Sequence, residues 1–190
     1  NVIAGTAALL KTGTSVLTMA GNTANTFSGG TTLRQGEIRV QNGGSLGTGT
    51  ITLGDASTGS GNVALYLDTN RASVSAPVVI SSNGAGTATL GSRSTVLGSG
   101  DNNQFTNITL QRDVIFDSNA ADRTDYENIS GTGNITVTGI GRSLLMSANT
   151  FIGTLAVSTG VGGSLQIGTN SAAFNAIPDT TAVTVSPGAN

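Results

Sequence analysis

The chain has 190 residues, of which 28 are glycine, and it contains no cysteine, histidine or tryptophan. These absences exclude disulfides, thiolate or imidazole metal sites and a Ser-His-Asp triad. Charged residues make up 9% of the chain, the formal net charge is −2 and Lys11 is the only lysine, so no basic face for nucleic acid can be assembled.

Short runs that alternate apolar and polar residues recur along the chain, and this period of two predicts β-strands with one buried face. In chain order the runs cover residues 37–40, 50–53, 63–67, 106–110, 134–138, 165–167 and 182–185. Clusters of glycine, asparagine and serine separate them and predict turns, because these residues tolerate positive φ. The predicted core residues are Ile38, Val40, Ile51, Leu53, Ile108, Leu110, Ile135, Val137, Leu165, Ile167, Val183 and Val185.

The chain also contains an internal repeat. Ala24-Asn25-Thr26-Phe27-x-Gly29 returns 124 residues later as Ala148-Asn149-Thr150-Phe151-x-Gly153. Two flanking patterns return 127 residues later: Leu17-x-Met19 as Leu144-x-Met146, and Gly36-x-Ile38-x-Val40 as Gly163-x-Leu165-x-Ile167. Such repetition marks a stacked architecture, in which each unit buries its apolar face against its neighbours. It favours a parallel β-solenoid over the antiparallel sandwich that the strand spacing also allows.

We interpret residues 1–190 as a single β-solenoid segment of a longer array, with repeat copies at about 1–54 and 128–190. Natural solenoids hide their ends under polar capping units. Here the residues Val2-Ile3 are apolar, and residues 182–185 still alternate. We therefore expect further rungs beside this segment, either in the same polypeptide or from identical chains stacked end to end into a fibre.

The first copy resembles the autotransporter-associated β-strand repeat. The matching residues are Leu17-x-Met19, Asn25-Thr-Phe27-Ser-Gly29-Gly30-Thr31-Thr32, Gly36-x-Ile38-x-Val40 and Gly44-Ser45-Leu46-Gly47. The match covers about 40 residues of the first copy, whereas the second copy departs from it at Ile152 and at residues 172–179. The resemblance implies a right-handed parallel β-helix in a large bacterial surface or secreted protein, and it implies no chemistry.

One cluster of acidic residues interrupts the sparse charge, interleaved with Arg112 and Arg123. Its members are Asp113, Asp117, Asp122, Asp125 and Glu127. A polysaccharide-cleaving site of the pectate-lyase type or a Ca²⁺ site would use carboxylates in this way. The alternative, which the lack of aromatic sugar platforms favours, is a solvated loop that joins two rungs.

Three weaker patterns remain. Gly98-Ser99-Gly100-Asp101-Asn102 is a single degenerate match to a calcium-binding nonapeptide that requires tandem copies, and it predicts a turn. Asn107-Ile-Thr, Asn128-Ile-Ser and Asn134-Ile-Thr fit the N-glycosylation sequon, and each also reads as the start of a strand with its isoleucine inside. Asparagines at equivalent turns, among them Asn25 and Asn149, would form amide ladders along a solenoid if they aligned.

These patterns predict a structural or adhesive repeat region of an exported bacterial surface protein or extracellular fibre, acting as a rigid spacer or presentation scaffold. The expected location is extracellular or on the cell surface, and the expected partners are neighbouring rungs and a cell-surface glycan or protein. No enzymatic activity, catalytic residue or cofactor is expected, and no apolar run approaches the roughly 20 residues that span a bilayer. The alternatives are the β-helix enzyme described above and a module whose outward threonines, such as Thr50/Thr52 or Thr136/Thr138, bind a glycan or ice.

Overall fold

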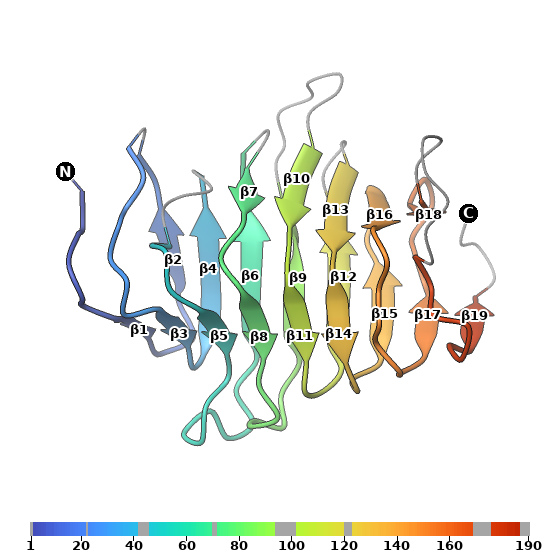
Figure 1. Ribbon diagram of the computed structural model, residues 1–190, viewed down its shortest axis with the longest axis horizontal. Coiled ribbons are helices and arrows are strands. Elements are labelled where there is room, and N and C mark those ends of the chain that lie inside the picture. The colour runs from blue at the N-terminus through green and yellow to red at the C-terminus, as the bar shows by residue number, and fades with distance from the viewer. Residues whose placement is uncertain are drawn as a thin grey trace.

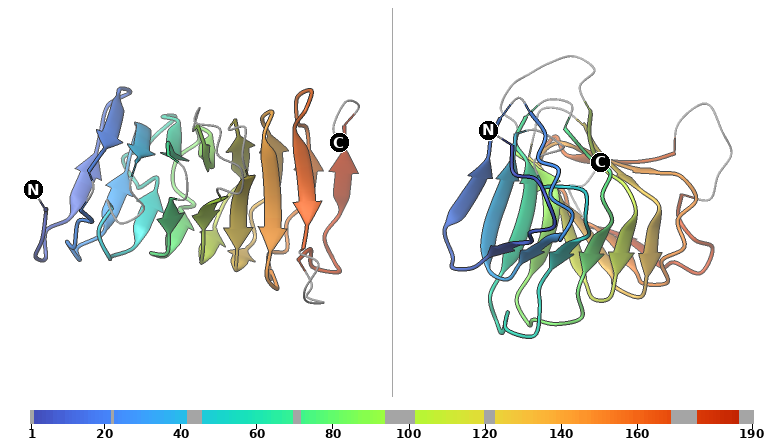
Figure 2. Two further views of the ribbon diagram at one scale, coloured as in Figure 1. Left: turned by 90° about the horizontal axis from the view of Figure 1, so that it is seen from above. Right: turned by 60° about the vertical axis from the view of Figure 1, so that its left-hand side comes forward.

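The computed structural model describes residues 2–21, 23–41, 46–69, 72–93, 102–119, 123–168 and 176–186. In these residues the chain winds into a β-solenoid of about six turns, and all the strand pairs are parallel. Strands of successive turns lie side by side along the long axis of the molecule (Figure 1), and the views of Figure 2 show the same stack. The predicted parallel β-helix is confirmed.

The strands form three sheets, which we call A, B and C in the order in which a turn visits them. Sheet A contains β1 (Leu9–Lys11), β3 (Thr31–Leu33), β5 (Ile51–Leu53), β8 (Val78–Ile80), β11 (Ile108–Leu110) and β14 (Ile129–Gly131). Sheet B contains β2 (Val16–Met19), β4 (Gly36–Val40), β6 (Val63–Leu67), β9 (Ala88–Ser92), β12 (Val114–Ser118), β15 (Ile135–Thr138), β17 (Leu155–Val157) and β19 (Val183–Val185). Sheet C contains β7 (Ser73–Val74), β10 (Asn102–Phe105), β13 (Arg123–Glu127), β16 (Arg142–Met146) and β18 (Ser164–Ile167).

The register of these sheets explains how a sequence with few large residues builds a core. In sheet A, Ile51 pairs with Val78 and Val78 with Ile108, so that apolar side chains of successive turns lie on one another. Since side chains alternate across a strand, the residue between each pair of inward residues faces outward. Thr52 and Thr109 occupy such positions and are only half-buried.

Burial confirms eight of the twelve predicted core residues. Each of the eight is at most 1% exposed: Ile38, Val40, Ile51, Leu53, Ile108, Leu110, Ile135 and Val137.

Of the other four predictions, the one for Leu165 is confirmed in part, because it packs against the core, and those for Ile167, Val183 and Val185 are wrong; the same physical reason applies to all four. Leu165 is only partly buried, whereas Ile167, Val183 and Val185 are 44%, 49% and 61% exposed. All four stand in register with buried positions of the preceding strand: Leu165 with Ser143, Ile167 with Leu145, Val183 with Leu155 and Val185 with Val157. They are uncovered because β18 and β19 are the last strands of sheets C and B among the described residues.

Polar groups also lie inside the solenoid, where sheets B and C meet. Ser92 and Thr124 share a hydrogen bond of 2.7 Å, and Ser118 and Ser143 share one of 2.8 Å; all four residues are fully buried. The buried Tyr126 donates to the carbonyl of Leu90 at 3.2 Å. Because each hydroxyl finds a partner, the core tolerates polar residues without the cost of unpaired groups.

The repeated Asn-Thr-Phe-x-Gly motif is a corner that is fixed to the preceding turn. Oδ1 of Asn25 accepts a hydrogen bond of 2.9 Å from the backbone N–H of Ile3, and Oδ1 of Asn149 accepts one of 2.9 Å from that of Ile129. The phenylalanine two positions on, Phe27 or Phe151, is buried. Thus these two asparagines pair with backbone of the neighbouring turn rather than with each other in a ladder.

The two copies of the repeat lie on different sheets. In the first copy the flanking strands β2 and β4 belong to sheet B, whereas in the second copy the corresponding strands β16 and β18 belong to sheet C. The 127 residues between the copies therefore do not make a whole number of turns. The motif specifies a corner of the solenoid and is not tied to one particular sheet.

Candidate functional site

The acidic stretch is not the predicted solvated loop. It folds into strands β12 and β13, which belong to sheets B and C respectively. Val114, Phe116 and Tyr126 are buried in the core and fix both strands, while Asp117 and Asp125 take the alternate positions that face outward. Asp122 lies outside the described residues, as do Gly98, Ser99, Gly100 and Asp101 of the nonapeptide-like segment.

Asp117 is the centre of a polar network on the outer surface of sheet B. Its carboxylate accepts hydrogen bonds from the hydroxyl of Tyr66 at 3.0 Å, from the hydroxyl of Thr138 at 3.2 Å and from Nδ2 of Asn119 at 3.0 and 3.2 Å. Arg93 donates to the Tyr66 hydroxyl at 2.9 Å, and its guanidinium carbon lies 4.0 Å from the centre of the tyrosine ring.

Tyr66 reaches Asp117 by lying across the strand between them. Tyr66, Gly91 and Asp117 are aligned on β6, β9 and β12, and a Cβ atom at Gly91 would lie 3.1 Å from the Tyr66 ring. Glycine thus leaves the space that the ring fills. Burial, with the nearby Asp117 charge, raises the pKa of Tyr66 to about 12, so the phenol stays protonated and holds the network together.

Asp125 and Glu127 lie on the outward side of sheet C and have other partners, and Asp125 is only 3% exposed there. Nε of Arg123 lies 2.6 Å from Oδ1 of Asp125, and Glu127 accepts a hydrogen bond of 2.7 Å from Gln104. Burial raises the pKa of the Asp125 carboxyl above its ordinary value, and the bond to Arg123 opposes that rise.

Asp113 precedes β12 and is bound to a third partner. Its Oδ1 accepts hydrogen bonds of 2.9 Å from both the backbone N–H and the side-chain amide of Asn134. The acidic residues are therefore divided among separate contacts. Within the described ranges, no group of three or more His, Cys, Asp or Glu side chains is arranged to hold a metal ion.

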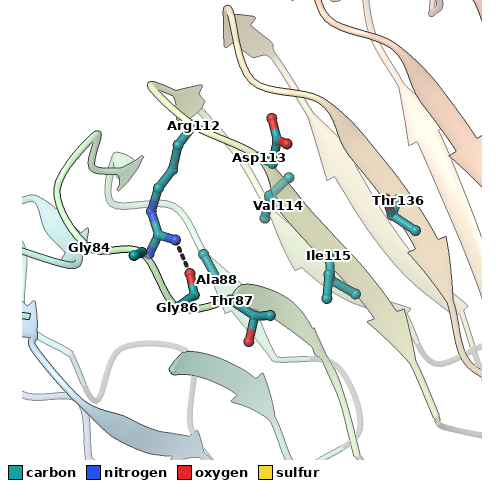
Figure 3. Close-up of a pocket in the computed structure, with 10 residues that line it drawn as sticks. Gly84, Gly86, Thr87, Ala88, Arg112, Asp113, Val114, Ile115 and Thr136 are labelled. Atoms are coloured by element: carbon teal, nitrogen blue, oxygen red, sulfur yellow. Dashed lines mark hydrogen bonds between the residues drawn. The ribbon is translucent and has the colours of Figure 1, made fainter. Parts of the chain in front are cut away.

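A hollow of about 420 Å³ beside this region was not apparent from the sequence. It lies between the turn of residues 84–87 and strands β12 and β15, with Asp113 at its rim and Ile115 and Thr136 along one side (Figure 3). Arg112 holds the turn in place, since its guanidinium donates to the carbonyl of Ser81 at 2.9 Å and to that of Gly86. The only sequence signal was the turn-forming Asn83-Gly84 pair, which gave no indication that Arg112 would contact it.

The outward threonines do not form one uniform row. In sheet A the outward positions of neighbouring strands are Thr32, Thr52, Val79, Thr109 and Ser130, so a valine interrupts the hydroxyl groups. In sheet B, the Thr138 hydroxyl is occupied by Asp117.

Comparison of the chain with known protein families, with curated proteins and with solved structures gives no match. The resemblance to the autotransporter-associated repeat therefore rests on the residues quoted above. In the part of the chain that the structure describes, no helix has the length and apolar character needed to cross a membrane. Fold and contacts together define the class of the protein as a parallel β-solenoid built from repeated corners.

Proposed function

We propose that this chain is a structural repeat region of an exported bacterial surface protein or extracellular fibre, in which it acts as a rigid spacer or presentation scaffold. The observation that carries the proposal is sheet B, whose eight parallel strands run from one end of the described molecule to the other. Sheets A and C flank it over one continuous apolar core. Bending such a stack would break backbone hydrogen bonds and open the core.

Two of the polar contacts of charged side chains support a scaffold because they tie neighbouring turns together. Arg34 pairs with Asp55 of the next turn at 2.7 Å, and Asp117 binds Tyr66 and Thr138 from two other strands. The extracellular location is inferred from the resemblance to passenger-type repeats. Without cysteine, packing and hydrogen bonds are the stabilising forces.

Rigidity is tested by measuring the distance between spin labels. The chain has no cysteine, so Thr18→Cys in β2 and Thr184→Cys in β19, both at exposed outward positions, introduce the only labelling sites. Seven strand spacings separate the two strands, or roughly 34 Å at about 4.8 Å each. The matched pair Thr18→Cys and Thr136→Cys spans five spacings, roughly 24 Å. Two narrow distributions that differ by this amount are expected, and a broad distribution for the longer pair contradicts a rigid spacer.

The polysaccharide-cleaving alternative has its own test. The protein is incubated with a panel of acidic and neutral polysaccharides, with and without calcium, and soluble products are measured. No product is expected. Calcium-dependent release that Asp117→Ala or Asp125→Ala abolishes would replace the scaffold proposal with the enzyme.

We further propose that the partners of this segment include neighbouring rungs, from the same or identical chains, besides a cell-surface glycan or protein. The support is the incomplete cover of inward apolar side chains at both ends of the described stack: Leu17 and Met19 on β2 are only partly buried, and Val183 and Val185 on β19 are exposed. Unpaired strand edges with apolar side chains favour the addition of further strands. Sedimentation of the 190-residue chain should show concentration-dependent association, and a monomer of constant mass with protected end-strand amides would contradict the proposal.

A further inference from the structure

Three Asn-Ile-Thr/Ser triplets share a sequence pattern, and the structure gives their asparagines different surroundings. Each triplet starts a strand: β11, β14 and β15 begin at Ile108, Ile129 and Ile135, and all three isoleucines are fully buried. Asn107 and Asn128 are exposed, and Thr109 and Ser130, two positions after them, take outward positions of β11 and β14.

Asn107 and Asn128 stand at exposed corners. Both have positive φ, 56° and 52°, and they occupy the same corner of adjacent turns, because Ile108 pairs with Ile129. Their side chains share a long hydrogen bond of 3.4 Å, donated by Nδ2 of Asn128 to Oδ1 of Asn107. β11 and β14, which follow these corners, lie next to each other in Figure 1.

Asn134 is held on both sides of its carboxamide. Nδ2 donates to Asp113 at 2.9 Å, while Oδ1 accepts from the backbone N–H of Thr154 at 2.8 Å and from its hydroxyl at 2.9 Å. The side chain is half-buried and connects three successive turns. An enzyme could glycosylate it only by breaking these bonds.

We propose that Asn107 and Asn128 are acceptor sites for N-linked glycosylation of the folded protein and that Asn134 is not. The co-substrate is a hexose activated as a nucleoside diphosphate, brought by an asparagine glycosyltransferase. Nδ2 attacks the anomeric carbon, the new C–N bond replaces the C–O bond to the diphosphate, and the nucleoside diphosphate leaves. A base of the transferase takes one proton from Nδ2, which keeps the other. The sugars would project from one corner of the solenoid, away from its core.

The experiment treats the purified 190-residue chain with a soluble asparagine glycosyltransferase and a nucleoside-diphosphate hexose, once folded and once unfolded in mild denaturant that the enzyme tolerates. Peptide mapping by mass spectrometry then locates the hexose. Modification of all three sequons in the unfolded chain establishes that the enzyme accepts each sequence. In the folded chain, Asn107 and Asn128 should be modified and Asn134 should remain at least tenfold less modified.

Matched variants show which asparagine carries each hexose that mass spectrometry detects. Thr109→Ala and Ser130→Ala remove one sequon each at half-buried outward positions and leave both asparagines in place, so each should abolish modification at one site only. Asp113→Ala releases Nδ2 of Asn134 and should raise modification there. Equal modification of Asn134 in the folded wild type, or no modification of Asn107 and Asn128 in a folded chain whose unfolded form is modified, would overturn the proposal.

Discussion

At the scale of single residues, neighbours in one strand differ in burial, because one side chain faces the core and the next faces the outer surface. Ile135 is fully buried, and Thr136, one position on, lies half-buried on the outer surface. Ile135 stacks between Val114 and Leu155 of the adjacent turns. Consecutive residues of one strand therefore make contributions of different size to stability.

Substitution of this pair should separate the two faces. Ile135→Ala is expected to lower the free energy of unfolding by about 2–5 kcal/mol, because it leaves a cavity between two turns. Thr136→Ala, the matched control, should change it by no more than about 0.5 kcal/mol. Denaturant unfolding of both variants measures the difference, and similar losses in the two would refute the assigned register.

Asp125 should make stability depend on pH in an unusual direction for an aspartate. Burial raises its pKa in the folded protein above the ordinary value of 3.8, so the folded state holds the proton more tightly than the unfolded state. Its contribution is therefore fully present below the unfolded pKa and is lost as pH rises through the folded pKa. We expect the free energy of unfolding of wild type, relative to Asp125→Asn, to fall over this window. A rise of that difference with pH would mean that the Arg123 contact outweighs burial.

Alternation in the sequence was sufficient to predict that Ile135 and Ile51 are buried, because the inside of a strand depends on local pattern. The contacts of Asp117 were not predictable in this way. Tyr66 lies 51 residues before it, and their hydrogen bond depends on the register of β6, β9 and β12 and on the missing side chain of Gly91. The charges of the acidic stretch predict a loop, whereas the burial of Val114, Phe116 and Tyr126 holds the stretch in two strands.

At the scale of elements, the Asn-Thr-Phe-x-Gly corner determines how closely two turns approach. A Cβ atom at Gly153 would lie 2.2 Å from the carbonyl oxygen of Gly133, and one at Gly29 would lie 2.5 Å from that of Ala7. The same position of both copies thus touches the backbone of the previous turn, which explains why the motif ends in glycine.

Gly153→Ala should therefore separate two turns at this corner and destabilise the protein by about 1–3 kcal/mol through overpacking. Gly160→Ala is the matched control, because the atom nearest to its added Cβ is the Cγ2 methyl group of the exposed Ile140 at 3.2 Å. The control should change stability by about 0.5 kcal/mol or less. Thermal unfolding of the two variants gives the comparison, and equal melting temperatures would show that the corner relaxes freely.

At the scale of the whole molecule, each turn contacts only the turns beside it, so stability should vary along the axis. Strands β6, β9 and β12 are paired on both sides and enclose fully buried residues, whereas β19 is paired on one side and its valines are exposed.

Hydrogen exchange of the native protein should reflect this gradient. Amides of β9 and β12 are expected to exchange at least tenfold more slowly than those of β2 and β19, because end strands open without disturbing the rest. Exchange measured strand by strand with mass spectrometry checks the order. Uniform protection along the axis would indicate that the solenoid opens only as one unit.

The placement of the two repeat copies on sheets B and C gives the surface a screw symmetry that the linear sequence hides. If the 127-residue spacing continued through further copies, each new motif would be rotated by about a third of a revolution from the last. Any group carried by the motif would then trace a spiral around the rod. A fibre with this geometry would present its binding groups along three sides in turn, and a target could approach it from any of the three.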